Sequence, residues 1–294
     1  MAGAVSRARG AIVTGGSRGL GLEMAFALAR SGVSVLAAAH IEDDFAACRA
    51  RAKAEGLDDK LFWQLADLRS AADCALIVER AQAQCGQTDI LVNNAGLTLT
   101  FVAPDLYTRT TPRRFYESSD TILQAVYATN VVAPEMLAAK VAPDMVTRGW
   151  GRIINVTTML STMERSGFAP YGSSKAALEM ASSVWAADLK DTGVTVNILN
   201  PGGGANTLGI AAQMRQASSE GRVPRLVEAH EMVPPLLWLT SDAADGVNGW
   251  RFDANLWDSA MPAAEAAQAA GRPAGFLLKD KAALSSALST SLPA

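Results

Sequence analysis

Short runs of β-branched and apolar residues alternate along this chain with longer stretches in which apolar residues recur at helical spacing. The helical pattern is clearest in the alanine-rich residues 20–31 and 74–85. Strand–helix alternation of this kind favours an α/β fold in which one doubly wound parallel β-sheet has helices on both faces. We therefore predict about seven strands, with their carboxyl ends along one edge where ligands bind. The predicted strands are residues 11–14, 34–38, 61–65, 90–93, 152–156, 195–199 and 250–253.

Two segments interrupt this alternation. Residues 202–226 follow a strand end, begin with glycines and then become polar, which is typical of a lid over a site or of a surface excursion. Beyond residue 255 the chain is rich in alanine and proline. We expect residues 1–255 to form one domain that includes the lid, and residues 256–294 to form a tail on the surface or on a neighbouring subunit.

Composition narrows the choice of partners and compartment. The 294 residues are 49% hydrophobic, enough for a large core, and the net charge of −3 comes with no basic block that would indicate nucleic-acid binding. No apolar run reaches the ~18 residues of a membrane span, and no apolar stretch follows the amino-terminal arginines as in a signal peptide. Three cysteines without metal-ligand spacing indicate reduced structural thiols, no metal site and a cytoplasmic protein: Cys48, Cys74 and Cys85.

A glycine-rich turn joins the first predicted strand to the first predicted helix. Its spacing is G-x-x-x-G-x-G. Glycines let the backbone turn tightly and approach a pyrophosphate, and a helix N-terminus supplies unpaired N–H groups. We expect a dinucleotide here, although the turn could be structural only. The expected contacts are Gly15, Ser17, Arg18, Gly19, Leu20 and Gly21.

A tyrosine and a lysine four residues apart, Tyr171 and Lys175, carry candidate chemistry. On a helix this spacing places both side chains on one face. A phenol has a pKa near ~10 and is a poor proton carrier at neutral pH. A neighbouring ammonium lowers the pKa of a phenol, which makes the tyrosine a usable general acid or base. Alone, the pair fits an ordinary helix surface equally well.

Three motifs in one order make the chain similar to a known family. With them it resembles the short-chain dehydrogenase/reductase family, in its short single-domain branch, over about residues 9 to 254. The resemblance implies a Rossmann-type fold, a nicotinamide cofactor, hydride transfer to or from a carbonyl or alcohol, and a homodimer or homotetramer. Members that reduce 3-oxoacyl thioesters are similar. The motifs are Thr14-Gly15-x-x-x-Gly19-x-Gly21, Asn93-Asn94-Ala95-Gly96 and Tyr171-x-x-x-Lys175.

The resemblance also implies catalytic roles. Tyr171 would exchange a proton with the substrate oxygen, and Lys175 would lower the tyrosine pKa and hold the nicotinamide ribose. Asn130 resembles the asparagine whose carbonyl anchors a water leading to that lysine, with a helix kink or a surface position as alternatives. Thirteen residues before the tyrosine, where the family has serine, stands Thr158, which keeps the hydroxyl but is stiffer at χ1. We expect Thr158 to replace the serine, with Ser161 as the alternative.

The second predicted strand favours NADP(H) over NAD(H). Ala39 stands where NAD-preferring relatives carry an aspartate that binds the ribose 2′-OH. Arg18 and His40 would suit a 2′-phosphate, and the carboxylates of residues 42–44 come slightly too late. Asp67 resembles the acceptor of the adenine amino group and could also be a helix N-cap. The other contacts that the resemblance implies are Leu68, Asn94, Ala95, Gly96, Pro201 and Gly202.

Apolar residues near the motifs suggest the substrate. Thr98, Met159, Met163 and Phe168 are candidate pocket residues, although several could be core. They suit reduction of an apolar ketone or a 3-oxoacyl compound by a carbonyl reductase. The alternatives are a dehydrogenase of a cyclic or sugar-derived alcohol and, outside the enzymes, an NADP-binding sensor or scaffold with little turnover.

Overall fold

Every predicted strand is present in the computed structural model of the chain, which describes residues 9–106 and 108–276. The observed bounds match the predicted ones to within one residue at each end. Seven strands are parallel, and a short eighth strand pairs antiparallel with the seventh. The strands are β1 (Gly10–Thr14), β2 (Ser34–Ala39), β3 (Leu61–Leu65), β4 (Ile90–Asn93), β5 (Gly151–Val156), β6 (Val194–Asn200), β7 (Trp250–Asp253) and β8 (Gly271–Pro273).

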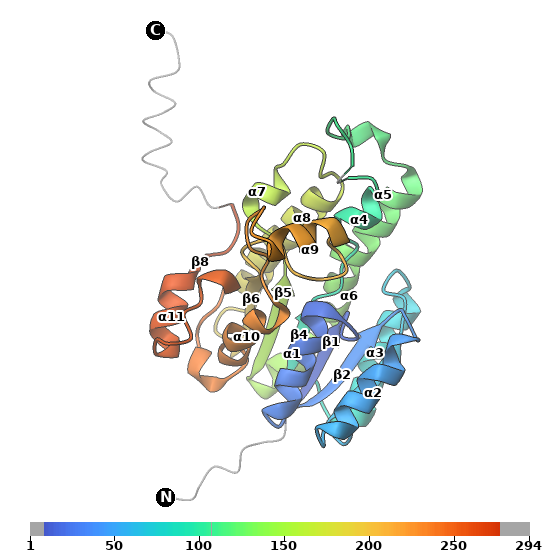
Figure 1. Ribbon diagram of the computed structural model, residues 1–294. Coiled ribbons are helices and arrows are strands. Elements are labelled where there is room, and N and C mark those ends of the chain that lie inside the picture. The colour runs from blue at the N-terminus through green and yellow to red at the C-terminus, as the bar shows by residue number, and fades with distance from the viewer. Residues whose placement is uncertain (1–8, 107, 277–294) are drawn as a thin grey trace, which may run out of the picture.

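Helices connect the strands and cover both faces of the sheet (Figure 1). The α-helices are α1 (Gly19–Arg30), α2 (Asp44–Ala54), α3 (Ala71–Cys85), α4 (Leu99–Val102), α5 (Asp120–Tyr127), α6 (Ala133–Arg148), α7 (Leu160–Met163), α8 (Tyr171–Asp188), α9 (Ala212–Ser219), α10 (Val233–Leu239) and α11 (Ala263–Ala270). A π-helical turn, η2 (Ala128–Val132), joins α5 to α6. The short 3-10 helices are η1 (Phe115–Glu117), η3 (Ala229–Met232), η4 (Asp242–Ala244) and η5 (Ala254–Leu256).

The strand order is β3-β2-β1-β4-β5-β6-β7-β8. The chain therefore winds outward from β1 in one direction, returns to β4 on the other side of β1, and then winds the opposite way. The carboxyl ends of the seven parallel strands lie along one edge, and a crevice forms there where the winding reverses. The glycine turn follows β1, the second motif follows β4, and residues 157–158 follow β5, so the fold gathers these segments at this edge.

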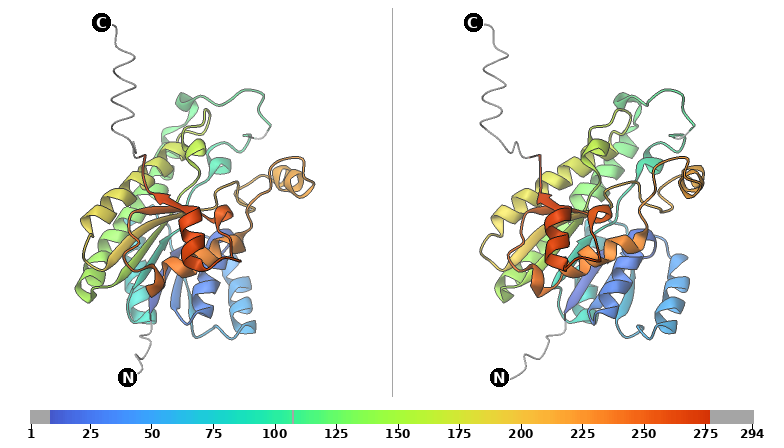
Figure 2. Two further views of the ribbon diagram at one scale, coloured as in Figure 1. Left: turned by 90° about the vertical axis from the view of Figure 1, so that its left-hand side faces the viewer. Right: turned by 60° about the vertical axis from the view of Figure 1, so that its left-hand side comes forward.

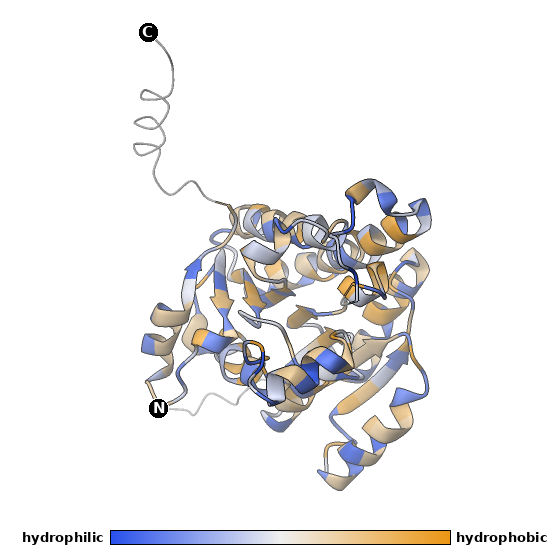
Figure 3. Ribbon diagram, turned by 45° about the horizontal axis from the view of Figure 1, so that its top comes forward, coloured by the Kyte–Doolittle hydropathy of each residue, from blue (hydrophilic) through white to orange (hydrophobic). Residues whose placement is uncertain are grey.

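Successive residues of each strand point to opposite faces, which creates two apolar cores. Val13 packs with Phe26 of α1 and Leu236 of α10 in one core. Ile12, one residue earlier, packs with Leu137 of α6 in the other. The hydropathy colouring shows apolar strands between helices that carry both hydrophobic and hydrophilic residues (Figure 3). Burial of both sheet faces explains why the strands read as continuous apolar runs.

The sheet continues past the predicted domain boundary at residue 255. After η5, helix α11 packs Ala266 and Ala267 inward, and β8 pairs Arg272 with Arg251 of β7. The expectation that the tail begins at residue 256 is therefore wrong for residues 263–273, which belong to the domain. The predicted tail residues 277–294 lie outside the described part of the chain.

The predicted lid contains helix α9 and stands away from the sheet. Figure 2 shows α9 projecting beyond the carboxyl edge in both views. The segment returns to the body at Val227, whose N–H donates to the carbonyl of Gly204 over 2.8 Å. Thr100 Oγ1 in α4 donates to the carbonyl of Gly209 over 3.1 Å. Only the base of the segment, around Thr207 and Gly209, therefore lies at the edge where the motifs meet, and its role as a lid stays a prediction.

The three cysteines are free thiols in α2 and α3, as predicted. Burial raises the pKa of the Cys85 thiol to about 11, so this thiol stays protonated at neutral pH. Within residues 9–106 and 108–276, no three histidine, cysteine or acidic side chains are grouped to hold a metal. No helix in that part of the chain is both long and apolar enough to cross a bilayer.

Candidate active site

The glycine turn after β1 has a backbone that favours glycine and leads into a helix start without a side-chain cap. Gly15 and Gly19 have φ values of +64° and +54°, in the left-handed region that favours glycine. A Cβ on Gly21 would lie 2.2 Å from the Gly15 carbonyl oxygen, so only glycine fits that position. Helix α1 starts without a side-chain cap on its first N–H groups and without an acidic residue in its first turn. These N–H groups are available to an anion.

Thr14 and Asn94 hold this turn against the end of β4. The Thr14 hydroxyl oxygen accepts from the backbone N–H groups of Asn94 and Ala95 over 3.0 and 3.1 Å. The Asn94 amide donates in return to the carbonyls of Thr14 and Gly15 over 2.9 and 3.3 Å. The second motif therefore fixes the backbone of the first, and Asn94 acts here through the protein rather than by reaching outward.

Arg18 forms an ion pair with Asp44, one of the carboxylates that come slightly too late in the sequence to take the place of an aspartate at Ala39. Its Nε donates to Asp44 Oδ2 over 2.8 Å, and the Ser17 hydroxyl donates to the same oxygen over 2.9 Å. The Arg18 side chain remains 41% exposed, so the pair lies at the surface of the crevice. Ala39 is buried and His40 is exposed, which leaves no carboxylate at the end of β2 itself.

Asp67 follows β3 and is paired with Arg69. The two side chains form an ion pair of 2.6 Å, and the guanidinium lowers the pKa of the Asp67 carboxyl. Asp67 does not cap the next helix: Ser70 accepts from the Asp73 N–H and caps α3. The N-cap alternative is therefore wrong. Asp67 and its partly buried neighbour Leu68 remain candidates for the adenine side of the cofactor.

Lys175 lies in the first turns of α8 with its ammonium buried beside the end of β5. Its Nζ donates to the carbonyl of Val156 over 2.8 Å. Burial lowers the pKa of Lys175 to about 8, because desolvation disfavours the charged form. Tyr171 begins the same helix and is partly buried, so the predicted helical spacing of the pair is observed.

Asn130 is fully buried in the π-helical turn η2. Its Oδ1 accepts from the Leu97 N–H over 2.8 Å, and its Nδ2 donates to the Leu97 carbonyl over 3.1 Å. The same Nδ2 donates to Ser174 Oγ in α8 over 3.0 Å. A surface position is therefore wrong for this residue. A Cβ on Gly96 would lie 3.3 Å from both Asn130 Oδ1 and Lys175 Nζ, so a side chain at this position would crowd both groups.

Thr158 follows β5 by two residues and is partly buried. Its carbonyl accepts from Arg251 Nη2 over 2.7 Å. Within the described residues its hydroxyl makes no hydrogen bond to the protein, which leaves it able to meet a ligand. The alternative, Ser161, is an exposed residue in α7. Thr158 is thus the better placed of the two hydroxyls.

The turn after β6 carries Pro201 and Gly202. The Gly202 N–H donates to Asn200 Oδ1 over 2.8 Å, and Gly202 has a φ of +75°. A Cβ on Gly202 would lie 1.8 Å from Asn255 Oδ1, so a side chain does not fit. The turn is tightly held at the crevice edge, where the resemblance puts the nicotinamide.

The candidate substrate residues lie around α7 and the lid. Met159 precedes α7, Met163 ends it, and both are partly buried. Met163 also lines a hollow of about 290 Å³, together with Phe115 and Ser173. Phe168 stacks under the Arg165 guanidinium, 5.0 Å from the ring centre. Thr98 pairs with Thr100 and is close to the lid residue Gly209.

Sequence reasoning missed three buried polar residues around this group. Ser174 is bonded to Asn130, and Glu179 and Arg251 form an ion pair of 2.7 Å. Glu179 stands four residues after Lys175, and Arg251 is a charge inside a strand, and these were the only local signals. The two residues are 72 positions apart in the chain, so no spacing rule connects them.

Comparison with known proteins identifies the family of this chain. Residues 9–218 match the family model of the short chain dehydrogenases. The chain belongs to the short-chain dehydrogenase/reductase family. Acetoacetyl-CoA reductase of Allochromatium vinosum is 31% identical over 84% of this chain and 97% of the relative. Gluconate 5-dehydrogenase of Gluconobacter oxydans is 30% identical over 81% of this chain and 90% of the relative. A solved structure of an actinorhodin polyketide ketoreductase variant with NADPH has a TM-score of 0.70 at 25% identity, covering 82% and 93% of the two chains.

Membership of this family makes the protein an oxidoreductase that uses a nicotinamide cofactor and acts on a small molecule. The residues present fit such a cofactor. The uncapped start of α1 beside Gly15 and Gly19 can receive a pyrophosphate. The Lys175 ammonium has three N–H donors, and one of them is used by Val156, so two are left for ribose hydroxyls.

Proposed function

We propose that the protein is an NADP(H)-preferring carbonyl reductase, in which Tyr171 and Lys175 carry the proton chemistry. The observation that carries this proposal is the buried Lys175 ammonium, which lies at the same end of α8 as Tyr171. It donates to the carbonyl of Val156, two residues before Thr158. A buried positive charge near a phenol stabilises the phenolate. An exposed lysine at the same spacing would not have this effect.

The proposed residues divide the work at the substrate oxygen. Tyr171 donates the proton during reduction, or removes it during oxidation, and the Lys175 ammonium favours the phenolate that results. The Thr158 hydroxyl donates a hydrogen bond to the same oxygen and stabilises its developing charge. Asn130 holds the turn after β4 and the start of α8 together through Leu97 and Ser174. When bound, the nicotinamide supplies or accepts the hydride.

The preference for NADP(H) rests on Arg18 and on the lack of a carboxylate at Ala39. A 2′-phosphate near His40 would replace Asp44 as the anion that Arg18 binds. Guanidinium and phosphate make strong bidentate contacts, which favours this exchange. The relative with bound NADPH supports the same choice.

For the substrate we propose an apolar ketone or a 3-oxoacyl compound. Met159, Met163 and Phe168 supply apolar surface next to the proposed proton donors. The similarity to acetoacetyl-CoA reductase supports this class. The similarity to gluconate 5-dehydrogenase favours, as a second candidate, a sugar-derived alcohol.

We also propose a homodimer or homotetramer. Met180 and Val184 on α8 are 43% and 54% exposed and lie one turn apart, so they could pack against a second copy. Light scattering measures the mass in solution, and a monomer would exclude this proposal. The cytoplasmic location stays a prediction.

The decisive experiment is NADPH consumption with apolar ketones, 3-oxoacyl thioesters and sugar ketones, using Tyr171→Phe as the control. Turnover that the control lacks would support a reductase and define its substrate class. Tight NADPH binding without turnover on any of these compounds would contradict the reductase and favour the sensor, with Thr158 in place of serine as the cause.

A further inference from the structure

Besides Lys175, a buried pair of charged residues, Arg251 of β7 and Glu179 of α8, lies next to Thr157 and Thr158. Arg251 and Glu179 have side chains that are 1% and 0% exposed, and their ion pair spans 2.7 Å. Removing two charges from water offsets much of their attraction, so a buried pair is weak evidence for stability alone. A buried pair next to a candidate active site therefore calls for an explanation in terms of what it touches.

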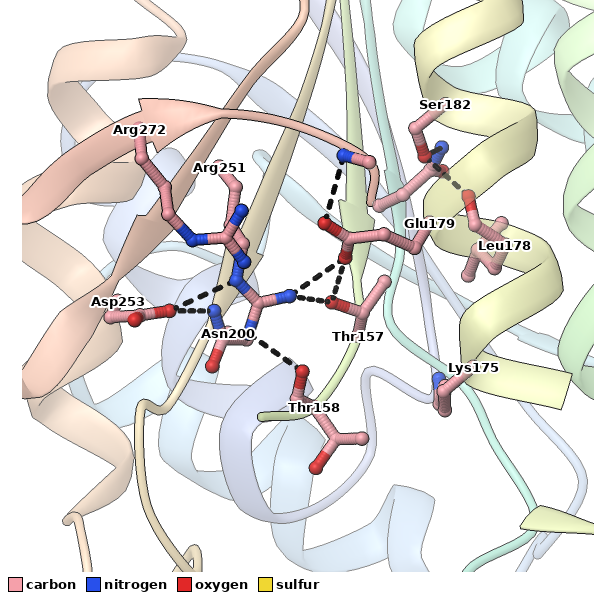
Figure 4. Close-up of polar contacts among 12 residues, drawn as sticks. Thr157, Thr158, Lys175, Leu178, Glu179, Ser182, Asn200, Arg251, Asp253 and Arg272 are labelled. Carbon is pink, nitrogen blue, oxygen red and sulfur yellow. Dashed lines mark hydrogen bonds and ion pairs between the residues drawn. The ribbon is translucent and has the colours of Figure 1, made fainter. Parts of the chain in front are cut away.

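The pair holds Thr157 and Thr158, which lead from the end of β5 into the site (Figure 4). Thr157 Oγ1 donates to Glu179 Oε2 over 3.1 Å and accepts from Arg251 Nη1 over 3.1 Å. Arg251 Nη2 donates to the Thr158 carbonyl over 2.7 Å. Val156, the residue before Thr157, accepts at its carbonyl from Lys175 Nζ. Residues 156–158 are thus fixed at three successive positions by side chains of α8 and β7.

The two charged residues are themselves fixed from behind. Arg251 Nε lies 3.3 Å from Asp253 Oδ1, close enough for an ion pair but without a hydrogen bond, and Asp253 also accepts from Asn200. Glu179 Oε1 accepts from the backbone N–H of Gly275 over 3.2 Å, so the chain beyond β8 contacts the cluster as well. Both charged side chains therefore also have a contact on the side away from Thr157 and Thr158.

We infer that Arg251 and Glu179 are positioning residues, which act by setting the direction of the Thr158 hydroxyl; this rests on the proposed role of Thr158 in carbonyl reduction. A threonine side chain is stiff at χ1, so the place of its hydroxyl depends on the backbone that carries it. A serine hydroxyl can rotate to correct an error of the backbone, and a threonine hydroxyl has less freedom to do so. Replacement of serine by threonine thus makes a firmly held backbone necessary, and Arg251 and Glu179 hold it.

The test compares Arg251→Met with Arg152→Met. Arg152 is also fully buried and lies in β5, but it pairs with Asp245 at the opposite end of the strand. Both variants remove a buried guanidinium, so both are expected to lower the melting temperature. Only Arg251→Met is expected to lower kcat, by roughly ten- to a hundredfold, which is what a small misplacement of a reacting group costs. The KM for the ketone and the Kd for NADPH should change less than about threefold, or ~0.7 kcal/mol.

A double variant separates positioning from general damage. In a Thr158→Val background the hydroxyl is gone, so adding Arg251→Met should leave kcat within about twofold of the Thr158→Val value. An additional loss equal to that in the wild-type background would overturn the inference, and so would a wild-type kcat in Arg251→Met. Glu179→Gln, which keeps the shape but removes the charge, should give an intermediate loss, and Arg251→Lys should restore part of kcat.

A measurement without turnover keeps the inference separate from the proposed function. Methyl NMR on threonine-labelled protein gives the signal of Thr158, assigned by its disappearance in Thr158→Ser. We expect this signal to shift and its χ1-dependent coupling to average in Arg251→Met but not in Arg152→Met. An unchanged Thr158 signal would refute the positioning role even if no substrate is found. A changed signal, together with wild-type protein inactive on every ketone, would refute the reductase and leave the positioning role intact.

Discussion

At the carboxyl ends of β1 and β2 the site is built mainly from main-chain atoms, whereas at the ends of β5 and β7 it is built from buried side chains. The first region offers the uncapped N–H groups of α1 and glycines such as Gly21, whose place a larger residue cannot take. The second offers Lys175, Glu179 and Arg251, all at most 4% exposed. Main-chain recognition suits a cofactor pyrophosphate, and buried charge suits proton transfer. Changes in the two regions should therefore alter different measured quantities.

The largest effect that we expect is on turnover, from Tyr171→Phe. Loss of a general acid typically costs ~10²–10⁴ in rate. NADPH affinity, measured by fluorescence titration, should stay within about twofold, or ~0.4 kcal/mol. A variant that keeps nearly full kcat would remove Tyr171 from the mechanism.

The converse effect is expected from Gly21→Ala, which should weaken the cofactor. The new Cβ would be 2.2 Å from the Gly15 carbonyl oxygen and 2.4 Å from Asn94 Nδ2, so the turn must shift. Overpacking of this kind costs ~1–3 kcal/mol. If the cofactor feels the whole distortion, its Kd rises about ten- to a hundredfold at ~1.4 kcal/mol per factor of ten.

Gly56→Ala is the matched control for that variant. Gly56 has a φ of +66°, so an alanine there strains the backbone, but no atom lies within 4 Å of its added Cβ. It should lower stability and leave the NADPH Kd unchanged. Equal effects of the two variants on the Kd would mean that the glycine turn is structural only.

A pH titration of stability tests the buried charge of the second region. Folding lowers the pKa of Lys175 from 10.5 to about 8, so between these values the unfolded chain binds more protons than the folded protein. Stability of the cofactor-free protein should therefore rise with pH across this window, by at most ~1.4 kcal/mol per pH unit.

Lys175→Met tests the origin of this pH dependence of stability, and Lys190→Met is the control. Lys190 is exposed, so its replacement should leave the slope as it is, whereas Lys175→Met should remove the contribution. Urea unfolding from pH 7.5 to 10.5 provides the measurement. A slope that survives in Lys175→Met would show that another group causes it.

The smallest effect concerns the choice between the two cofactors. Arg18→Ala should weaken NADPH roughly tenfold more than NADH, since a charge-assisted contact contributes ~1.5–3 kcal/mol. Asp44→Asn should act in the opposite direction, by a few-fold, because a partly exposed ion pair contributes ~0–1 kcal/mol. Calorimetry on both variants measures the Kd of NADPH and of NADH. Equal changes in the two Kd values would contradict the preference for NADP(H).

Local pattern was enough to predict most of the fold. The strands from β1 to β7 are apolar runs bounded by turns, and helices such as α1 and α3 have the period that the sequence shows. Strand β8 was not predicted because Gly271–Pro273 is short, contains a proline and has no alternation of apolar and polar residues. It is a strand only because β7 lies beside it. Helix α11 was missed because Ala263–Ala270 is short and stands in an alanine- and proline-rich stretch, whose composition alone favours a tail.

By itself the sequence determined the fold class, the order of the motifs and the edge of the sheet at which they meet, because periodicity and turn chemistry are local properties. Only the tertiary structure decided which charges pair. Asp44 reaches Arg18 across 26 positions, and Glu179 reaches Arg251 across 72. Such pairs depend on distances in space between elements that are far apart in the chain. The sequence shows that the charges exist, and the packing of α8 against β5 and β6, with β7 beside β6, brings the pair to Thr157 and Thr158.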